Sequence, residues 1–247
     1  MRTAVIIPSR YSSTRLEGKP LVDIAGKPMI QRVYEAASQA TLIDRIIVAT
    51  DDERIFNTVV QFGGEAEHTA PHHTSGTDRI AEVAEHLNCD IVVNLQGDEP
   101  LMDPRLIDEV VSSVRDNEEI YMASSKTPIK RIEDRQNPHI VKVVSDYNNY
   151  ALYFSRSPLP YCFRGHEQEE VSLGFRHIGL YVYRKDFLMH LVRLEPSPLE
   201  KQERLEQLRV LENGYRIKLV PTDYDAPGVD TPDDLARVRT IMEGPED

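Results

Sequence analysis

The sequence is poor in cysteine, with only Cys89 and Cys162 among its 247 residues. The two cysteines form no Cys-x-x-Cys motif and do not have the spacing of metal ligands. Disulfide frameworks use larger sets of cysteines and belong to oxidising compartments. We therefore expect no disulfide framework, and a reducing cytoplasm as the working environment.

Long hydrophobic runs are also missing. No stretch approaches the roughly 18 apolar residues that a transmembrane helix needs, so we expect no insertion into a membrane. The apolar run at the N-terminus, residues 3–8, is too short for a signal peptide, and no small-residue cleavage site follows it. We interpret this run as the first buried strand of a cytoplasmic protein.

Positive charge is in deficit. The chain has 29 Lys and Arg against 41 Asp and Glu, which gives a formal net charge of −12. This balance argues against nucleic acids and anionic membranes as partners, because both attract basic surfaces. It does not argue against a small anion that a few local cations hold. Hydrophobic residues make up 40% of the chain, enough for a sizeable core.

The first half of the chain alternates short β-branched runs with helical patterns. Buried strands are predicted at 3–8, 45–50 and 90–95, and apolar residues recur at helical spacing between and after them, most strongly in 106–114. This alternation is typical of an α/β fold with an open, mostly parallel sheet, similar to the Rossmann type. The length fits a single domain over 1–247.

From about residue 121 the pattern changes. We expect a β-rich inserted region over about 121–215, with strands at 121–128, 140–145, 151–155 and 178–184.

The end of the chain has clear helix signals. One amphipathic helix is predicted at 199–211, stopped by Asn213 and Gly214. A strand at 216–221 follows. Thr231 is the expected cap of the last helix, with Pro232 in its first turn.

Three cations lie within ten residues directly after the first strand: Arg10, Arg15 and Lys19. In a doubly wound sheet this is the carboxyl edge, where ligands bind. Arginine offers forked donors to phosphate oxygens and lysine a point charge, so the loop suits a triphosphate. Ser12 and the flexible Gly18 would help backbone amides approach it. The alternative is a solvated polar loop, because the GxxxxGK[ST] pattern of a P-loop is missing.

Two aspartates lie next to predicted secondary-structure elements and are candidates for binding a metal ion. Asp98 lies in the turn after the predicted strand 90–95, and Asp230 directly precedes the capped helix at Thr231. Mg²⁺ usually takes one or two carboxylates together with substrate phosphates, so the pair are candidate ligands of one ion. The alternatives are an ordinary turn at Asp98 and an aid to helix initiation at Asp230.

The remaining polar candidates are weaker alone. Residues 75–79 open a helix whose free amides suit a polar ligand, although simple capping explains them equally well. In the second half Arg156, His177, Glu206 and Gln207 stand out as polar residues near apolar patterns. A structural histidine and a solvated helix face are the alternative explanations there.

Together these segments resemble the 3-deoxy-manno-octulosonate cytidylyltransferase (CMP-Kdo synthetase) family. The matching blocks run in order over almost the whole chain: IIPSRYSSTRLEGKPLVDIAGKPMI, IIVATDDERI, SGTDRIAEV, VNLQGDEPL, VKVV, ALYFSRSPLPY, RHIGLYVYR, LEQLRVLENG and GVDTPDDL. One departure is Glu17, where the family pattern has proline. That change affects the flexibility of the first loop and removes none of its three cations.

The resemblance implies a fold, a reaction and a site. The fold is an open nucleotidyltransferase sheet whose inserted region helps to form a homodimer. The reaction transfers CMP from CTP to Kdo for lipopolysaccharide or capsule synthesis, with Mg²⁺ held by Asp98 and Asp230. The implied nucleotide site is Pro8, Arg10, Ser12, Arg15, Lys19, Ser75, Gly76, Arg79, Gln96 and Asp98. The implied sugar-acid pocket is Gln96, Arg156, His177, Tyr181, Glu206 and Gln207. Arg10, Arg15, Lys19, Asp98 and Asp230 are the implied catalytic set.

Other functions stay open from the sequence. The sugar acceptor would be 8-amino-Kdo or a sialic acid in a related cytidylyltransferase. A metal-dependent glycosyltransferase on a similar sheet usually shows Asp-x-Asp, whereas this chain has Asp98-Glu99-Pro100. A regulatory protein that binds nucleotide without turnover would lack a metal carboxylate or a loop cation, and none is missing here.

Overall fold

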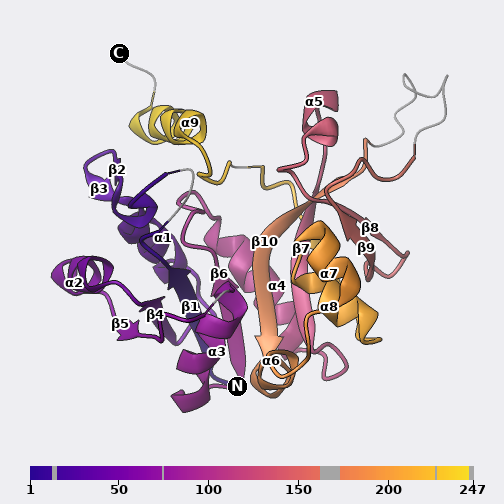
Figure 1. Cartoon of the computed structure of the whole chain (residues 1–247), viewed down its shortest axis with the longest axis horizontal. Coiled ribbons are helices and arrows are strands. Elements are labelled where there is room, and N and C mark those ends of the chain that lie inside the picture. Colours follow the sequence, from indigo (N-terminus) through magenta and orange to yellow (C-terminus); the bar gives the residue numbers. More distant parts are fainter. Residues whose placement is uncertain (13–15, 74, 162–172, 226, 245–247) are drawn as a thin grey trace.

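The main sheet of the computed structural model has helices on both faces (Figure 1). The structure describes residues 1–12, 16–73, 75–161, 173–225 and 227–244. Its strand order is β11-β7-β10-β6-β1-β4-β5, with β8 and β9 off this path. The central strands are β1 (Thr3–Ser9), β4 (Arg45–Thr50) and β6 (Ile91–Leu95), which pair in parallel. The predicted open, mostly parallel sheet is confirmed.

Along the path from β11 to β5, β10 runs against the other strands. β10 (Phe175–Arg184) is antiparallel to both β6 and β7 (Met122–Pro128). β11 (Lys218–Pro221) is parallel to β7, and β5 (Ala66–His68) to β4. Because β10 is reversed, its first residues lie at the edge where the parallel strands end. The first half of β10 therefore lies at the same edge of the sheet as the carboxyl end of its neighbour β6.

Both faces of the sheet are buried, which explains the continuous apolar runs of its strands. In β1, Ala4 and Ile6 pack on one face, whereas Val5 and Ile7 pack on the other. The first face is covered by α3 (Gly76–His86), α6 (Lys185–Leu191) and α8 (Gln207–Glu212). The second is covered by α1 (Met29–Ser38), α2 (Glu53–Gln61) and α4 (Pro104–Arg115).

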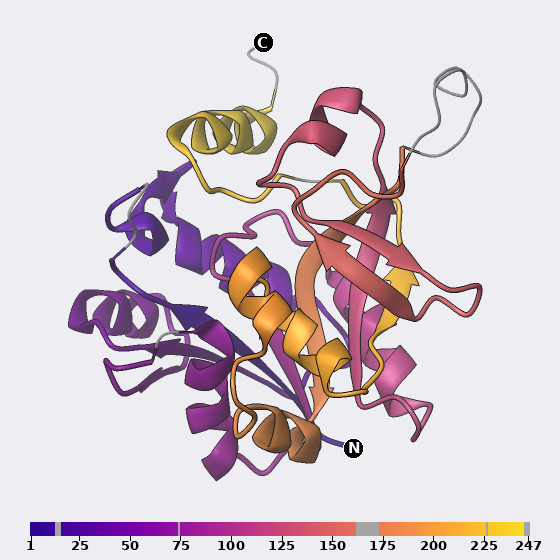
Figure 2. The ribbon, with the colours of Figure 1, turned by 45° about the vertical axis from the view of Figure 1, so that its right-hand side comes forward.

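The stretch expected to be an insertion contributes to two structures. Its strands β7 and β10 complete the main sheet, whereas β8 (Lys142–Ser145) and β9 (Ala151–Ser155) form an antiparallel pair at its side (Figure 2). A short helix, α5 (Ile132–Gln136), precedes this pair.

The single helix predicted at 199–211 is wrong. The segment forms α7 (Pro198–Glu203) and α8, separated at Arg204, which adopts a left-handed conformation with φ 54°. Arg156 donates from Nε to the carbonyl of Glu203 at 2.9 Å and from Nη2 to that of Arg204 at 3.4 Å. These are carbonyls that a continuous helix would use in its own ladder. The guanidinium therefore stabilises the break.

The last helix confirms its predicted start. α9 (Pro232–Glu243) has a capping box between Thr231 and Asp234, and it packs on the small hairpin of β2 (Asp23–Ile24) and β3 (Lys27–Pro28). The short 3-10 helix η1 (Lys19–Leu21) leads into that hairpin. Among the described residues, none of the helices has the length and apolar character that crossing a bilayer requires.

We expect Thr231→Ala to lower the free energy of unfolding by about 1 kcal/mol, because it removes the side-chain acceptor of the Asp234 amide. Urea unfolding followed by circular dichroism measures the change. Thr240→Ala is the matched control, since this exposed threonine lies on the same helix and bonds only to the carbonyl of Ala236. Equal stability of the two variants would show that the cap does not matter.

Candidate active site

A cavity of about 890 Å³ opens at the carboxyl edge of the sheet. It lies between the end of β6, the start of α3, the first half of β10 and the segment before α9. The break between α7 and α8 forms another part of its wall. Segments far apart in the sequence thus share one cavity because the strands that carry them are neighbours in the sheet.

Asp98 reaches the cavity from a turn that β1 and β6 define together. Gly97 lies so close to β1 that a Cβ there would meet the carbonyl oxygen of Pro8 at 3.2 Å. The segment before α9 is tied to the same turn, because the Val229 amide donates to the Asp98 carbonyl at 2.8 Å. Gly228 allows this approach, since a Cβ there would meet Glu99 Oε1 at 3.1 Å. This backbone contact brings Asp230 beside Asp98.

The ammonium of Lys19 lies between the two predicted metal carboxylates. Its Nζ is 2.7 Å from Asp98 Oδ2 and 3.0 Å from Asp230 Oδ1. Burial works against the charged form of Lys19, but the carboxylates of Asp98 and Asp230 outweigh it and raise the lysine pKa. The three residues therefore form one charged cluster, of which Asp98 and Asp230 line the cavity.

Glu99 is a third acid that the sequence pattern did not indicate, because Glu-Pro signals only a turn. Burial, together with the negative charge of Asp98, raises the pKa of Glu99 to about 8, although Arg176 opposes the shift. Glu99 is therefore mostly protonated at neutral pH.

The donor chemistry of this cluster fits Mg²⁺. Two carboxylate oxygens converge on one cation, and Mg²⁺ typically takes one or two carboxylates plus waters and phosphate oxygens. Within the described ranges, no group of three or more His, Cys, Asp or Glu side chains could hold a metal alone. The two carboxylates suit an ion that also takes phosphate oxygens as ligands.

The first loop lies beside this cluster and is described in part. Arg10 and Ser12 are exposed, and Pro8 is the half-buried penultimate residue of β1. Arg15, the second predicted phosphate cation, lies outside the described residues. Gly18, with φ 64°, precedes the turn that presents Lys19.

Of the residues at the start of α3, one caps the helix and others line the cavity. Ser75 caps the helix, with its Oγ accepting from the Asp78 amide at 3.0 Å. Gly76 and Thr77 line the cavity. Arg79 is fully buried and pairs with Asp51 at 3.3 Å, so its predicted contact with nucleotide has no geometric support.

His177 and Tyr181 project from β10 beside Gln96, and all three line the cavity. Burial lowers the pKa of His177 to about 3, and Arg176 adds to the effect. Ser124 Oγ lies 2.8 Å from His177 Nε2 and donates to the carbonyls of Ile178 and Leu180. Because a hydroxyl has one proton, these contacts favour the His177 tautomer that donates from Nε2, which leaves Nδ1 as the acceptor of the ring.

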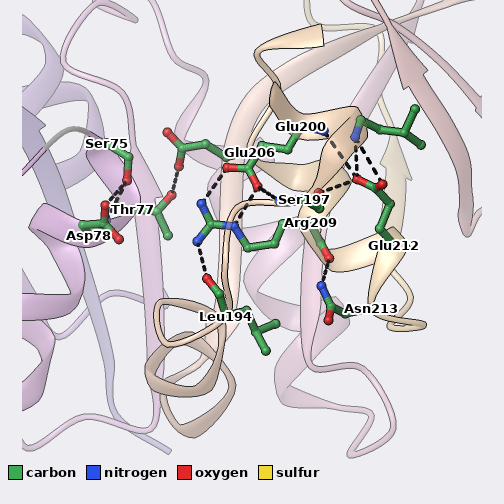
Figure 3. A network of polar contacts seen from close by, with 11 residues as sticks. Ser75, Thr77, Asp78, Leu194, Ser197, Glu200, Glu206, Arg209, Glu212 and Asn213 are labelled. Carbon is green, nitrogen blue, oxygen red and sulfur yellow. Dashed lines mark hydrogen bonds and ion pairs between the residues drawn. The ribbon is translucent and has the colours of Figure 1, made fainter. Parts of the chain in front are cut away.

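Glu206 and Gln207 follow the break between α7 and α8 and line the cavity. Thr77 donates to Glu206 Oε2 at 2.5 Å, which connects α3 to α8 across the cavity (Figure 3). Burial raises the pKa of Glu206. The segment is supported from behind by Arg209, which makes a two-pronged ion pair with buried Glu200.

Arg156 also lines the cavity, but its guanidinium is engaged with backbone. Besides its two bonds at the helix break, Nη1 donates to the Pro138 carbonyl at 3.0 Å. Arg176, which the sequence did not single out, lies on the same wall and pairs with Asp225 at 3.4 Å. In the sequence, only its position next to the candidate His177 pointed to Arg176 as a residue of the site.

The match to known proteins covers most of the chain. A family model described as cytidylyltransferase matches residues 4–217. The 3-deoxy-manno-octulosonate cytidylyltransferase of Geotalea uraniireducens (strain Rf4) is 53% identical over 245 residues, covering 96% of this chain and 98% of that protein. The protein of the same name from Syntrophotalea carbinolica is 50% identical over 254 residues, covering 99% and 100%.

Solved structures agree with this match. The structure of CMP:2-keto-3-deoxy-manno-octonic acid synthetase complexed with CTP has a TM-score of 0.92 at 42% identity, covering 98% of this chain and 99% of that one. A cytidylyltransferase from Leptospira borgpetersenii has a TM-score of 0.66 at 16% identity, covering 98% and 87%. The second shares the fold alone.

We expect His177 to stay neutral, as its Nε2–H tautomer, from pH 9 down to about pH 4. The folded pKa of about 3 lies below the ordinary 6.5, so the unfolded chain binds the extra proton between these values. Because the unfolded chain takes up this proton first, the free energy of unfolding is highest above pH 6.5 and falls as the pH drops from 6.5 toward 3. Nitrogen-15 NMR of the imidazole, assigned by the signal lost in His177→Asn, measures the protonation state and the tautomer of the ring. A midpoint near pH 6.5 would contradict the buried geometry.

Proposed function

The chain belongs to the cytidylyltransferase family, and from that premise we propose that it transfers CMP from CTP to Kdo, 3-deoxy-D-manno-octulosonate. The anomeric hydroxyl of the sugar acid attacks the α-phosphorus of CTP, and pyrophosphate leaves. The observation that carries the proposal is the cavity itself, with a Lys19–Asp98–Asp230 cluster at one part and a polar pocket on β10 and α8 at another. Relatives that match almost the whole chain carry the same activity in their names.

The charged cluster suits the triphosphate end of the nucleotide. Lys19 and Arg10 lie on the loop after β1, and Arg15 belongs to the same loop in the sequence. Asp98 and Asp230 would hold Mg²⁺, which supplies charge neutralisation at the phosphates and the attacking oxygen when it is bound. The cations of the loop compensate charge on the leaving pyrophosphate. Alignment and electrostatics then account for catalysis without a covalent intermediate.

The pocket on β10 and α8 suits a polyhydroxylated sugar acid. Neutral His177, with Nδ1 as its acceptor, would accept a hydrogen bond from a sugar hydroxyl rather than bind the carboxylate. Gln96, Tyr181, Glu206 and Gln207 add further donors and acceptors. Arg156 acts through the helix break that presents Glu206. Arg176 is the cation on this wall that is placed to attract the sugar carboxylate.

Three finer points belong to the same proposal. A cytoplasmic location follows from CTP as the donor, and the product would serve as sugar donor for lipopolysaccharide or capsule synthesis. A homodimer is supported by apolar side chains that the β8–β9 pair and the following loop expose, namely Tyr147, Leu152 and Tyr161. Sedimentation equilibrium decides the homodimer, since a monomer has a mass of 28.2 kDa.

Pyrophosphate release tests the substrates directly. With Kdo as acceptor, we expect CTP to exceed UTP by at least about tenfold in kcat/KM, because one unpaired buried hydrogen-bonding group costs about 1–3 kcal/mol. Kdo reduced at its carboxylate to an alcohol should lose most activity. The acceptor 8-amino-Kdo is measured in parallel, since preference for it would assign the amino sugar. Equal rates with CTP and UTP, or with Kdo and its reduced analogue, would sink the proposal.

Asp98→Asn and Asp230→Asn should each lower kcat by roughly a thousandfold, about 4 kcal/mol of transition-state stabilisation. The double variant should be little worse than either single one, because both side chains would hold the same ion. Asp116→Asn is the matched control, an exposed aspartate after α4. A single variant that keeps more than about a third of the wild-type rate at saturating Mg²⁺ would remove that residue from the metal site.

A further inference from the structure

The ammonium of Lys19 lies at the place proposed for the metal ion. Its ammonium bonds both carboxylates proposed to hold the metal, at 2.7 and 3.0 Å. The lysine side chain is only 12% exposed, whereas those of Asp98 and Asp230 are 34% and 45% exposed. A lysine that contacts phosphates during the reaction is therefore bound to the metal ligands before it.

The ammonium and a divalent ion exclude each other from this place. Mg²⁺ would bind the same oxygens at about 2.0–2.1 Å, which puts it in the space that Nζ fills. Two cations a few ångströms apart at a partly buried site also repel each other strongly. The metal therefore enters the pair of carboxylates only when the ammonium leaves.

The chain around Lys19 lets the ammonium leave without a change of fold. The backbone is held in place, since the Lys19 amide donates to the Leu16 carbonyl at 3.2 Å and Pro20 is buried. The lysine stem is a flexible four-carbon chain. A phosphate placed along the first loop offers the ammonium a new anionic partner within the swing of that stem.

We propose that Lys19 couples metal binding to nucleotide binding: it blocks the Asp98–Asp230 pair in the free protein and releases it when a triphosphate takes the ammonium. The free protein then has little affinity for divalent cations, and the ion enters together with the nucleotide. The coupling is reciprocal, so the ion strengthens nucleotide binding by the same factor. This inference rests on the proposed function for the identity of the metal ligands.

Binding of Mn²⁺ alone, without nucleotide, tests the proposal by a readout that needs no turnover. Electron paramagnetic resonance measures the free aqua ion during a titration of the protein. We expect Lys19→Met to bind one Mn²⁺ at least tenfold more tightly than the wild type, because its two carboxylates lose their internal cation. Lys27→Met is the matched control for a general charge effect, since Lys27 pairs with Glu35 at 2.8 Å elsewhere in the N-terminal segment.

A second substitution locates the gain. Adding Asp98→Asn to Lys19→Met should remove it, because one of the two released carboxylates is lost. Lys19→Gln repeats the measurement with a polar side chain if circular dichroism shows that the methionine variant is misfolded. Equal Mn²⁺ affinity of wild type and Lys19 variants, or a gain that survives Asp98→Asn, overturns the coupling. Neither result touches the proposed function, which fails instead if CTP and UTP, or Kdo and its reduced analogue, react at equal rates.

Discussion

The structure depends on bringing two carboxylates together and compensating their charge. Asp98 and Asp230 are 132 positions apart in the sequence, and like charges this close repel unless a cation lies between them. Lys19 is that cation in the free protein. The backbone bond from Val229 to the Asp98 carbonyl holds the second carboxylate in register with the first. Gly97 and Gly228 permit the close backbone approaches that bring the two aspartates together, because neither carries a Cβ atom.

The reversal of β10 is the second constraint, and it gives the cavity two chemical parts. A parallel strand in this place would deliver its last residues to the carboxyl edge, whereas the antiparallel strand delivers its first ones, Arg176 and His177. The loop after β1 and the first half of β10 thus reach the cavity from separate strands of one sheet. The break between α7 and α8 completes the pocket, and Arg156 stabilises it by bonding the carbonyls that a continuous helix would use.

Sequence periodicity predicted the sheet well, because strands buried on both faces leave continuous apolar runs that a solvated loop does not imitate. The strands at 45–50 and 151–155 and the cap at Thr231 were correct to the residue. The prediction of one helix at 199–211 was wrong because the break is stabilised by Arg156. That residue is distant in the sequence, so local periodicity could not indicate its contact. Glu99 and Arg176 were missed for a related reason, since their importance comes from burial and neighbours rather than from spacing.

In the proposed coupling, Asp98, Asp230 and Lys19 exchange partners when nucleotide and metal arrive together. A crystal structure with Mn²⁺ and a non-hydrolysable CTP analogue, with manganese located by anomalous scattering, tests it most directly. We expect a manganese peak bound to both Asp98 and Asp230, with Lys19 Nζ moved to a phosphate oxygen. A manganese peak elsewhere, or Lys19 still between the two carboxylates, would contradict it.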